Sequence, residues 1–88
     1  MSAKTQLRKY AVEWIENQAT GKVFHLFDIY KYLETDFPEE CRTAGITVSD
    51  GRPYHEFASR DAIRHCKIQK VIAHTRKGRW KEGYWKRI

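Results

Sequence analysis

The chain has 88 residues, and 41% of them are hydrophobic, which suits a single domain over residues 1–88 with a modest core. Its formal net charge is +6, but residues 1–50 carry six Lys/Arg against eight Asp/Glu, whereas residues 51–88 carry eleven against three. No apolar run is long enough to span a bilayer and the N-terminus lacks a signal peptide's apolar segment, so we expect a cytoplasmic, nucleoid-associated protein, or a nuclear one in a eukaryote, without membrane contact.

Two amphipathic helices with a short strand between them are predicted for the first part of the chain. In Lys4–Ala19, apolar side chains recur at helical spacing, and Ser2 or Thr5 can cap the start of this helix. Lys22–His25 is β-rich and predicts a brief strand. Phe27–Asp36 predicts the second helix, because its apolar side chains again share one face.

The stretch Pro38–Pro53 is predicted to be a long loop. Pro38 ends the preceding helix, and the stretch is rich in glycine, serine, threonine and aspartate. Ile46 and Val48 alternate with polar residues and suit a short edge strand. Loops of this length are often functional, and this one has basic and hydroxyl side chains suited to phosphate contacts. They are Arg42, Thr43, Thr47, Ser49 and Arg52.

A third helix is predicted within Pro53–Lys67, with two alternatives for its start. Either Pro53 is its first helical residue, or Ser59 caps a shorter helix. Both alternatives place basic side chains at i, i+4 and i+7 on the side away from the core, namely Arg60, Arg64 and Lys67. The residues expected to share the core are Leu7, Trp14, Ile15, Ile29, Leu33, Ala62 and Ile63.

The C-terminal segment is predicted to be a β-hairpin with a basic loop. Val71–Thr75 and Tyr84–Ile88 are β-rich and alternate, and Gly78 and Gly83 allow the intervening chain to turn. The loop carries four cations and a tryptophan, namely Arg76, Lys77, Arg79, Trp80 and Lys81. Aromatic side chains among basic ones suit a polyanion, and nucleic acid is the first choice.

The order of these elements resembles that of a winged helix-turn-helix DNA-binding domain over about residues 5–88. The resemblance implies an α+β fold, in which a three-helix bundle with a short strand carries a C-terminal β-hairpin wing. It also implies that the third helix enters the major groove of double-stranded DNA and that the wing contacts the backbone or minor groove. The connection between helices two and three is about fifteen residues, which departs from the tight turn of a simple helix-turn-helix.

The candidate nucleic-acid contacts lie on the third helix and the wing. They are Ser59, Arg60, Arg64, Lys67, Arg76, Lys77, Arg79, Trp80 and Lys81. Arginine on a helix can pair with guanine edges in bidentate fashion, and cations on a hairpin can neutralise phosphates. We therefore expect a sequence-specific or structure-specific DNA-binding protein, either a small transcriptional regulator acting as a homodimer or the recognition module of a larger system. A winged-helix protein-interaction adaptor and an RNA-binding module remain alternatives.

Catalytic and cofactor chemistry are not predicted. The sequence lacks a nucleophile elbow, a glycine-rich phosphate-binding loop and a deaminase zinc motif. Its four histidines and two cysteines show no paired ligand spacing, so we expect no metal site and no small-molecule cofactor. Cys41 and Cys66 are too few for a disulfide framework and are expected to be free thiols.

Overall fold

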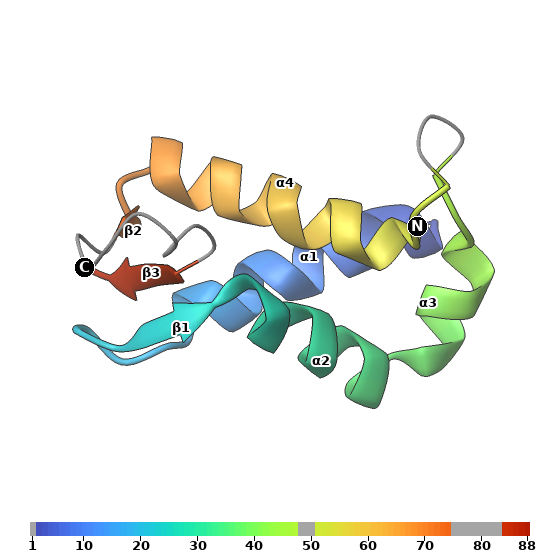
Figure 1. Ribbon diagram of the computed structural model, residues 1–88, viewed down its shortest axis with the longest axis horizontal. Coiled ribbons are helices and arrows are strands. Elements are labelled where there is room, and N and C mark those ends of the chain that lie inside the picture. Colours follow the sequence, from blue (N-terminus) through green and yellow to red (C-terminus); the bar gives the residue numbers. More distant parts are fainter. Residues whose placement is uncertain (1, 48–50, 75–83) are drawn as a thin grey trace.

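A computed structural model describes residues 2–47, 51–74 and 84–88. This part of the chain is α+β, with helices packed together and a small sheet at one end (Figure 1). Its four helices and three strands are, in chain order, α1 (Ala3–Glu16), β1 (Val23–His25), α2 (Leu26–Asp36), α3 (Pro38–Ala44), α4 (Tyr54–Ile68), β2 (Ile72–His74) and β3 (Tyr84–Arg87).

The first helix, α1, lies in the middle of the helical layer and packs most extensively on α4 (Figure 1). It begins after Ser2, whose hydroxyl accepts a hydrogen bond from the N–H of Thr5 at 3.2 Å and so caps the helix. Its apolar face, formed by Leu7, Ala11 and Ile15, is completely buried. The predicted helix and its cap at Ser2 are therefore confirmed.

Strand β1 passes directly into α2 without a connecting loop. His25 is both the last residue of the strand and the N-cap of the helix. Its Nδ1 accepts a hydrogen bond from the N–H of Phe27 at 2.9 Å, and the Asp28 carboxylate accepts one from the N–H of His25 at 2.9 Å. This reciprocal pair is a capping box, which satisfies two N–H groups that the helix leaves without partners.

The cap at His25 gives a testable stability difference. Replacing His25 with alanine removes the Nδ1 acceptor, so we expect the free energy of unfolding to fall by about 1 kcal/mol. His25→Asn restores an acceptor at the cap and should keep most of the stability. Urea denaturation of the two variants and the unmodified protein measures the difference. Equal losses in both variants would assign the stabilisation to the imidazole ring contacts rather than to the cap.

The segment after α2 differs from its prediction, because residues 38–44 form the helix α3. Pro38 occupies the first turn, where its missing N–H has no helical partner to lose. The Arg42 guanidinium donates to both carboxylate oxygens of Glu39, at 2.9 and 3.0 Å, one turn earlier. The prediction of a loop over all of Pro38–Pro53, and of three helices rather than four, is wrong because Pro38 both ends one helix and begins the next.

Beyond α3, the chain makes an isolated β-bridge between Ile46 and Pro53. Val48 lies outside the described residues, so the predicted edge strand over Ile46 and Val48 stays a prediction. Helix α4 then begins at Tyr54, with Pro53 as its N-cap residue. Ser59 lies inside this helix, which shows that the alternative of a shorter helix capped by Ser59 is wrong.

The sheet has the order β1-β3-β2, and both neighbours run antiparallel to β3. Trp85 on β3 is opposite Phe24 on β1 and His74 on β2. The predicted pairing of Val71–Thr75 with Tyr84–Ile88 is therefore confirmed for the described residues of the two strands. The structure adds β1 as the third strand, which ties the residues following α1 to the C-terminal part of the chain.

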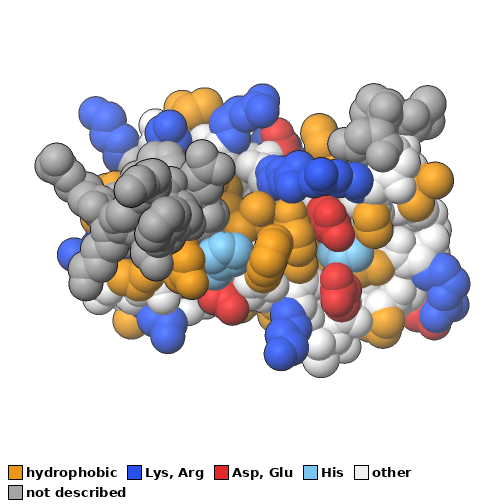
Figure 2. Space-filling view, in the orientation of Figure 1, with side chains coloured by type: hydrophobic (Ala, Val, Ile, Leu, Met, Phe, Trp, Pro, Cys, Tyr) orange, Lys and Arg blue, Asp and Glu red, His pale blue; other side chains and the backbone are white. Residues whose placement is uncertain are grey.

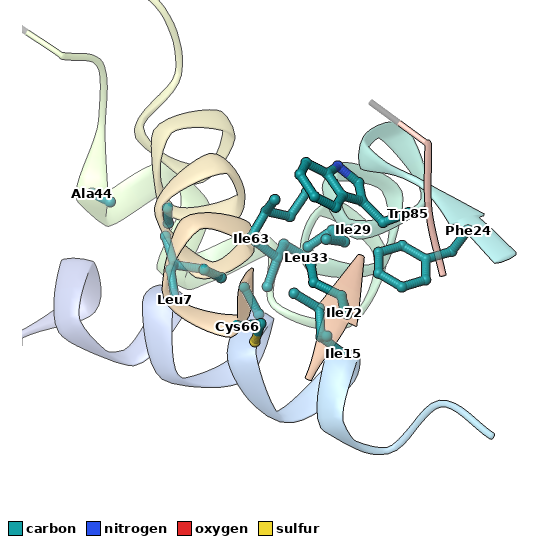
Figure 3. Close-up of a cluster of buried hydrophobic side chains, with 13 residues drawn as sticks. Leu7, Ile15, Phe24, Ile29, Leu33, Ala44, Ile63, Cys66, Ile72 and Trp85 are labelled. Atoms are coloured by element: carbon teal, nitrogen blue, oxygen red, sulfur yellow. The ribbon is translucent and has the colours of Figure 1, made fainter. Parts of the chain in front are cut away.

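The core lies where α1, α2 and α4 meet the inner face of the sheet (Figure 3). Leu33 and Ile63 lie near its centre, and Phe24 and Trp85 close it from the strands (Figure 3). Six of the seven predicted core residues are buried: Leu7, Ile15, Ile29, Leu33, Ala62 and Ile63. The seventh, Trp14, is half-buried because its ring covers the edge of the core, 5.2 Å from the Phe24 ring centroid.

Candidate nucleic-acid interface

The exposed side of α4 carries the three cations that the sequence predicts there. The opposite side is buried against the other elements through small and apolar side chains, Ala58, Ala62, Ile63 and Cys66. Since these positions fill the inner face, the helical period leaves Arg60, Arg64 and Lys67 exposed. The structure therefore brings three of the predicted contact residues together on one rigid element. We call these three residues the α4 cations.

Arg60 is held in place from α2. Its Nε donates a hydrogen bond to the Tyr30 hydroxyl at 3.1 Å. Burial raises the pKa of Tyr30 above its ordinary value, although the Arg60 charge opposes this rise, so the phenol remains neutral at physiological pH and accepts the bond. Because the bond uses Nε, the two Nη groups remain available for a bidentate contact with a phosphate or a base edge.

Lys67 lies at the other end of α4, next to the sheet. Its Nζ is 6.0 Å from the centroid of the Trp85 ring, which is a cation–π contact between α4 and β3. Strand β2 follows α4 after a short turn, so the sheet lies at the C-terminal end of the helix (Figure 1). The α4 cations therefore extend from the α2 side of the molecule to the base of the predicted hairpin.

The predicted wing contacts lie outside the described residues. They are Arg76, Lys77, Arg79, Trp80 and Lys81. The strands on either side of these residues, β2 and β3, are described and paired antiparallel. Arg87, on β3, makes bonds within the fold, because its guanidinium donates to the carbonyl oxygens of Glu16 and Val71 at 3.3 and 3.5 Å.

Ser59 does not belong to this surface. Its side chain is completely buried, and its hydroxyl donates to the His55 carbonyl oxygen one turn earlier at 2.8 Å. The prediction that Ser59 contacts nucleic acid is therefore wrong. The position falls on the inner side of α4, where a small side chain that bonds to its own helix can be buried without leaving a polar group unsatisfied.

Two residues of the predicted loop that were candidates for phosphate contacts, Arg42 and Thr47, also make contacts within the chain. The charge of Arg42 is matched by Glu39 in α3. The hydroxyl and the N–H of Thr47 both donate to the carbonyl oxygen of Arg52, at 3.3 and 2.7 Å. Ser49 lies outside the described residues.

The structure also reveals a feature that the sequence did not predict, a row of aromatic and imidazole rings beside the α4 cations. The centroid distances are 4.5 Å for Tyr84–His25, 4.5 Å for His25–Phe27, 5.4 Å for Phe27–Tyr30 and 6.1 Å for Tyr30–His55. We call these five residues the ring strip. Orange and pale-blue side chains meet across the centre of the face in Figure 2, with basic side chains along its α4 edge.

Next to the ring strip, a shallow groove separates α2 from the first half of α4. Its walls include Phe27 and Tyr30 together with charged residues of both signs, Lys31, Glu34, Arg52, Glu56 and Arg60. Across it, the buried His55 ring places Nε2 2.7 Å from a carboxylate oxygen of Glu34 and so ties α4 to α2. On the far side of α4, an ion pair between Arg8 and Asp61 ties it to α1.

Both cysteine thiols lie at least partly buried within the fold. Burial raises the pKa of the thiols of Cys41 and Cys66 to about 11, so both are neutral and weakly nucleophilic at physiological pH. Within residues 2–47, 51–74 and 84–88, no three histidine, cysteine, aspartate or glutamate side chains are close enough to hold a metal ion.

None of the described helices is both long and apolar enough to cross a membrane.

The aromatic side chains of α1 pack against other parts of the same chain. The Tyr10 ring stacks on Phe37 with 3.9 Å between centroids, and Trp14 covers Phe24. These rings therefore help to close the helical layer.

Comparison of the chain with protein families, with curated proteins and with solved structures finds no significant match.

Proposed function

We propose that this chain is a winged-helix domain that binds double-stranded DNA, as a small transcriptional regulator or as the recognition module of a larger system. The observation that carries the proposal is the exposure of the α4 cations on one side of a 15-residue helix whose other side is anchored in the core. Such a helix is roughly 22 Å long and about 10–12 Å wide with its side chains. It fits the major groove, which is about 12 Å wide.

The hairpin β2–β3 supports the same proposal. It lies at the C-terminal end of α4, and the loop between its strands contains Arg76, Lys77, Arg79 and Lys81 in the sequence. On this proposal the loop contacts the phosphate backbone or the minor groove while α4 contacts base edges. Phosphate neutralisation then supplies affinity, and arginine pairing with guanine supplies specificity. Because one domain of this size covers little DNA, we also propose that a regulator of this kind acts as a homodimer.

The proposed roles of α4 in reading bases and of the hairpin in contacting phosphates can be tested separately. We expect Arg64→Ala to weaken binding to a selected site by about 1–3 kcal/mol and to relax sequence preference, since Arg64 lies on a rigid helix. We expect Lys77→Ala to weaken selected and scrambled sites alike and to lower the salt slope by about one, since it neutralises a phosphate. Competition binding of both variants to the two sites measures these effects.

The matched control is Lys9→Ala, which removes an exposed cation from α1 and leaves the α4 surface intact. It should change neither the affinity nor the preference by more than a small factor. If Arg64→Ala lowers the affinities for both sites equally, α4 does not read the sequence. In that case the hairpin loop or the segment between α3 and α4 becomes the better candidate.

A second candidate function is binding to an acidic protein surface as an adaptor. Two large apolar side chains favour it, because Phe57 is 51% exposed and Ile68 is 68% exposed, near the two ends of α4. Helical spacing places them on the same side as Arg64. Titrations against duplex DNA, single-stranded DNA and an acidic protein at two salt concentrations separate the candidates, because only the DNA-binding domain should favour the duplex.

A further inference from the structure

Phe27 occupies an unusual position for a large apolar side chain. It lies in the first turn of α2 and is 63% exposed. The His25 ring lies against it edge-on, with 4.5 Å between centroids and an interplanar angle of 67°. The centroid of the Tyr30 ring lies 5.4 Å from that of Phe27, and the two rings are tilted by 34°. The phenyl ring is therefore supported within the ring strip while much of its surface remains open.

The groove beside Phe27 is lined by charges of both signs, and one of its cations is held in a fixed orientation. The cations are Lys31, Arg52 and Arg60. Two acids, Glu34 and Glu56, line the same groove, and Glu34 bonds to His55 at 2.7 Å. Nearby, Asp28 accepts the His25 N–H at 2.9 Å. Arg60 is oriented by Tyr30 through Nε, which leaves its Nη groups for a phosphate.

An exposed ring next to an oriented guanidinium is the arrangement that suits a nucleotide with an unpaired base. Bases stack on aromatic side chains whatever their sequence, because every base has a π-face, while cations along the groove follow the backbone. The inside of a base-paired duplex does not offer such a face to a ring on the protein surface. A nucleic acid offers such a face where one of its bases is unpaired.

We infer that Phe27 stacks on an unpaired base next to the duplex, while Arg60 contacts a phosphate of the same strand. The preferred ligand is then duplex DNA with a short single-stranded tail or a gap. This inference rests on the proposed function and specifies its substrate class. Stacking on one aromatic ring changes affinity by roughly 5- to 100-fold, so the preference for tailed over blunt DNA should fall in that range.

The experiment compares three ligands that share one duplex: a blunt end, a short thymidine tail and an abasic tail of equal length. The abasic tail has the same phosphates as the thymidine tail but no bases. We expect the thymidine tail to tighten binding by about 5- to 100-fold over the blunt duplex, and the abasic tail to do far less. Fluorescence anisotropy at fixed salt, with tails of both polarities, measures the ratios.

Two matched variants test whether Phe27 is the stacking ring. Phe27→Ala should reduce the tailed-to-blunt ratio to near one while the affinity for the blunt duplex is unchanged. Phe57→Ala, which removes an exposed phenyl ring from α4, should keep the ratio. Because both side chains are exposed, we expect both variants to fold, and urea denaturation verifies this. As an independent readout, 5-iodouracil in the tail should photocrosslink to the peptide that contains Phe27.

Several outcomes would overturn the inference while duplex binding stands. They are equal affinity for tailed and blunt DNA, an abasic tail as effective as the thymidine tail, and equal effects of Phe27→Ala and Phe57→Ala. A parallel loss of blunt and tailed binding in Phe27→Ala would place that ring against the duplex instead. If neither ligand binds at all, the proposed function fails and this inference fails with it.

Discussion

The affinity for duplex DNA is expected to fall roughly a thousandfold when the salt concentration rises from about 50 to about 200 mM. Each neutralised phosphate releases condensed counterions, and six such contacts produce a drop of that size. The α4 cations supply three exposed positive charges, and the sequence between β2 and β3 contains four more. A fall in affinity of this size would make electrostatics the main source of the affinity for DNA.

A series of titrations tests this directly. The slope of log K against log salt is measured for the unmodified protein, for Lys67→Ala and for Lys9→Ala. Lys67→Ala should lower the slope by about one, because Lys67 belongs to the proposed interface. Lys9→Ala, which removes the same charge from α1, should leave it unchanged. An affinity that stays flat across this salt range would contradict phosphate contact and favour the protein-interaction module.

The second large effect concerns the core at Leu33. We expect Leu33→Ala to lower the free energy of unfolding by about 2–5 kcal/mol, because the side chain is completely buried and its removal leaves a cavity among rigid neighbours. Small domains have about 5–15 kcal/mol of stability in total, so this change removes a large share. Urea denaturation should show a lower midpoint with an unchanged slope.

Ile68→Ala is the control for this prediction. Ile68 is 68% exposed at the end of α4, so its truncation should change the free energy of unfolding by no more than about 0.5 kcal/mol. Similar losses in Leu33→Ala and Ile68→Ala would mean that the described core does not hold the helices together. It would also imply that Ile68 is covered by another part of the protein.

Local patterns in the sequence predicted most of the elements. Apolar spacing located α1, α2 and the body of α4, and the same period placed Arg60, Arg64 and Lys67 on one exposed side. These features follow from the chemistry of neighbouring residues along the chain. The predicted ends of these helices and strands differ from the observed ones by only a few residues.

Other features depended on information that local patterns lack. Pro38 has the same effect on the preceding helix whether a loop or a new helix follows, so α3 was missed. Ser59 has the chemistry of a cap, and only the packing of α4 shows that it is buried. The ring strip requires a contact between His25 and Tyr84, which are far apart in the sequence and are joined by strand pairing.

The central place of β3 in the sheet has a consequence for how the chain folds. Val23 pairs with Lys86, so the first strand finds its partner only when most of the chain, the part between these two residues, has been brought into a loop. Closing such a loop reduces conformational entropy before the pairing can compensate, whereas the helices form from contacts close along the chain. We therefore expect the helices to form before β1 pairs with β3. The His25–Tyr84 contact, and with it the complete ring strip, requires this pairing of β1 with β3.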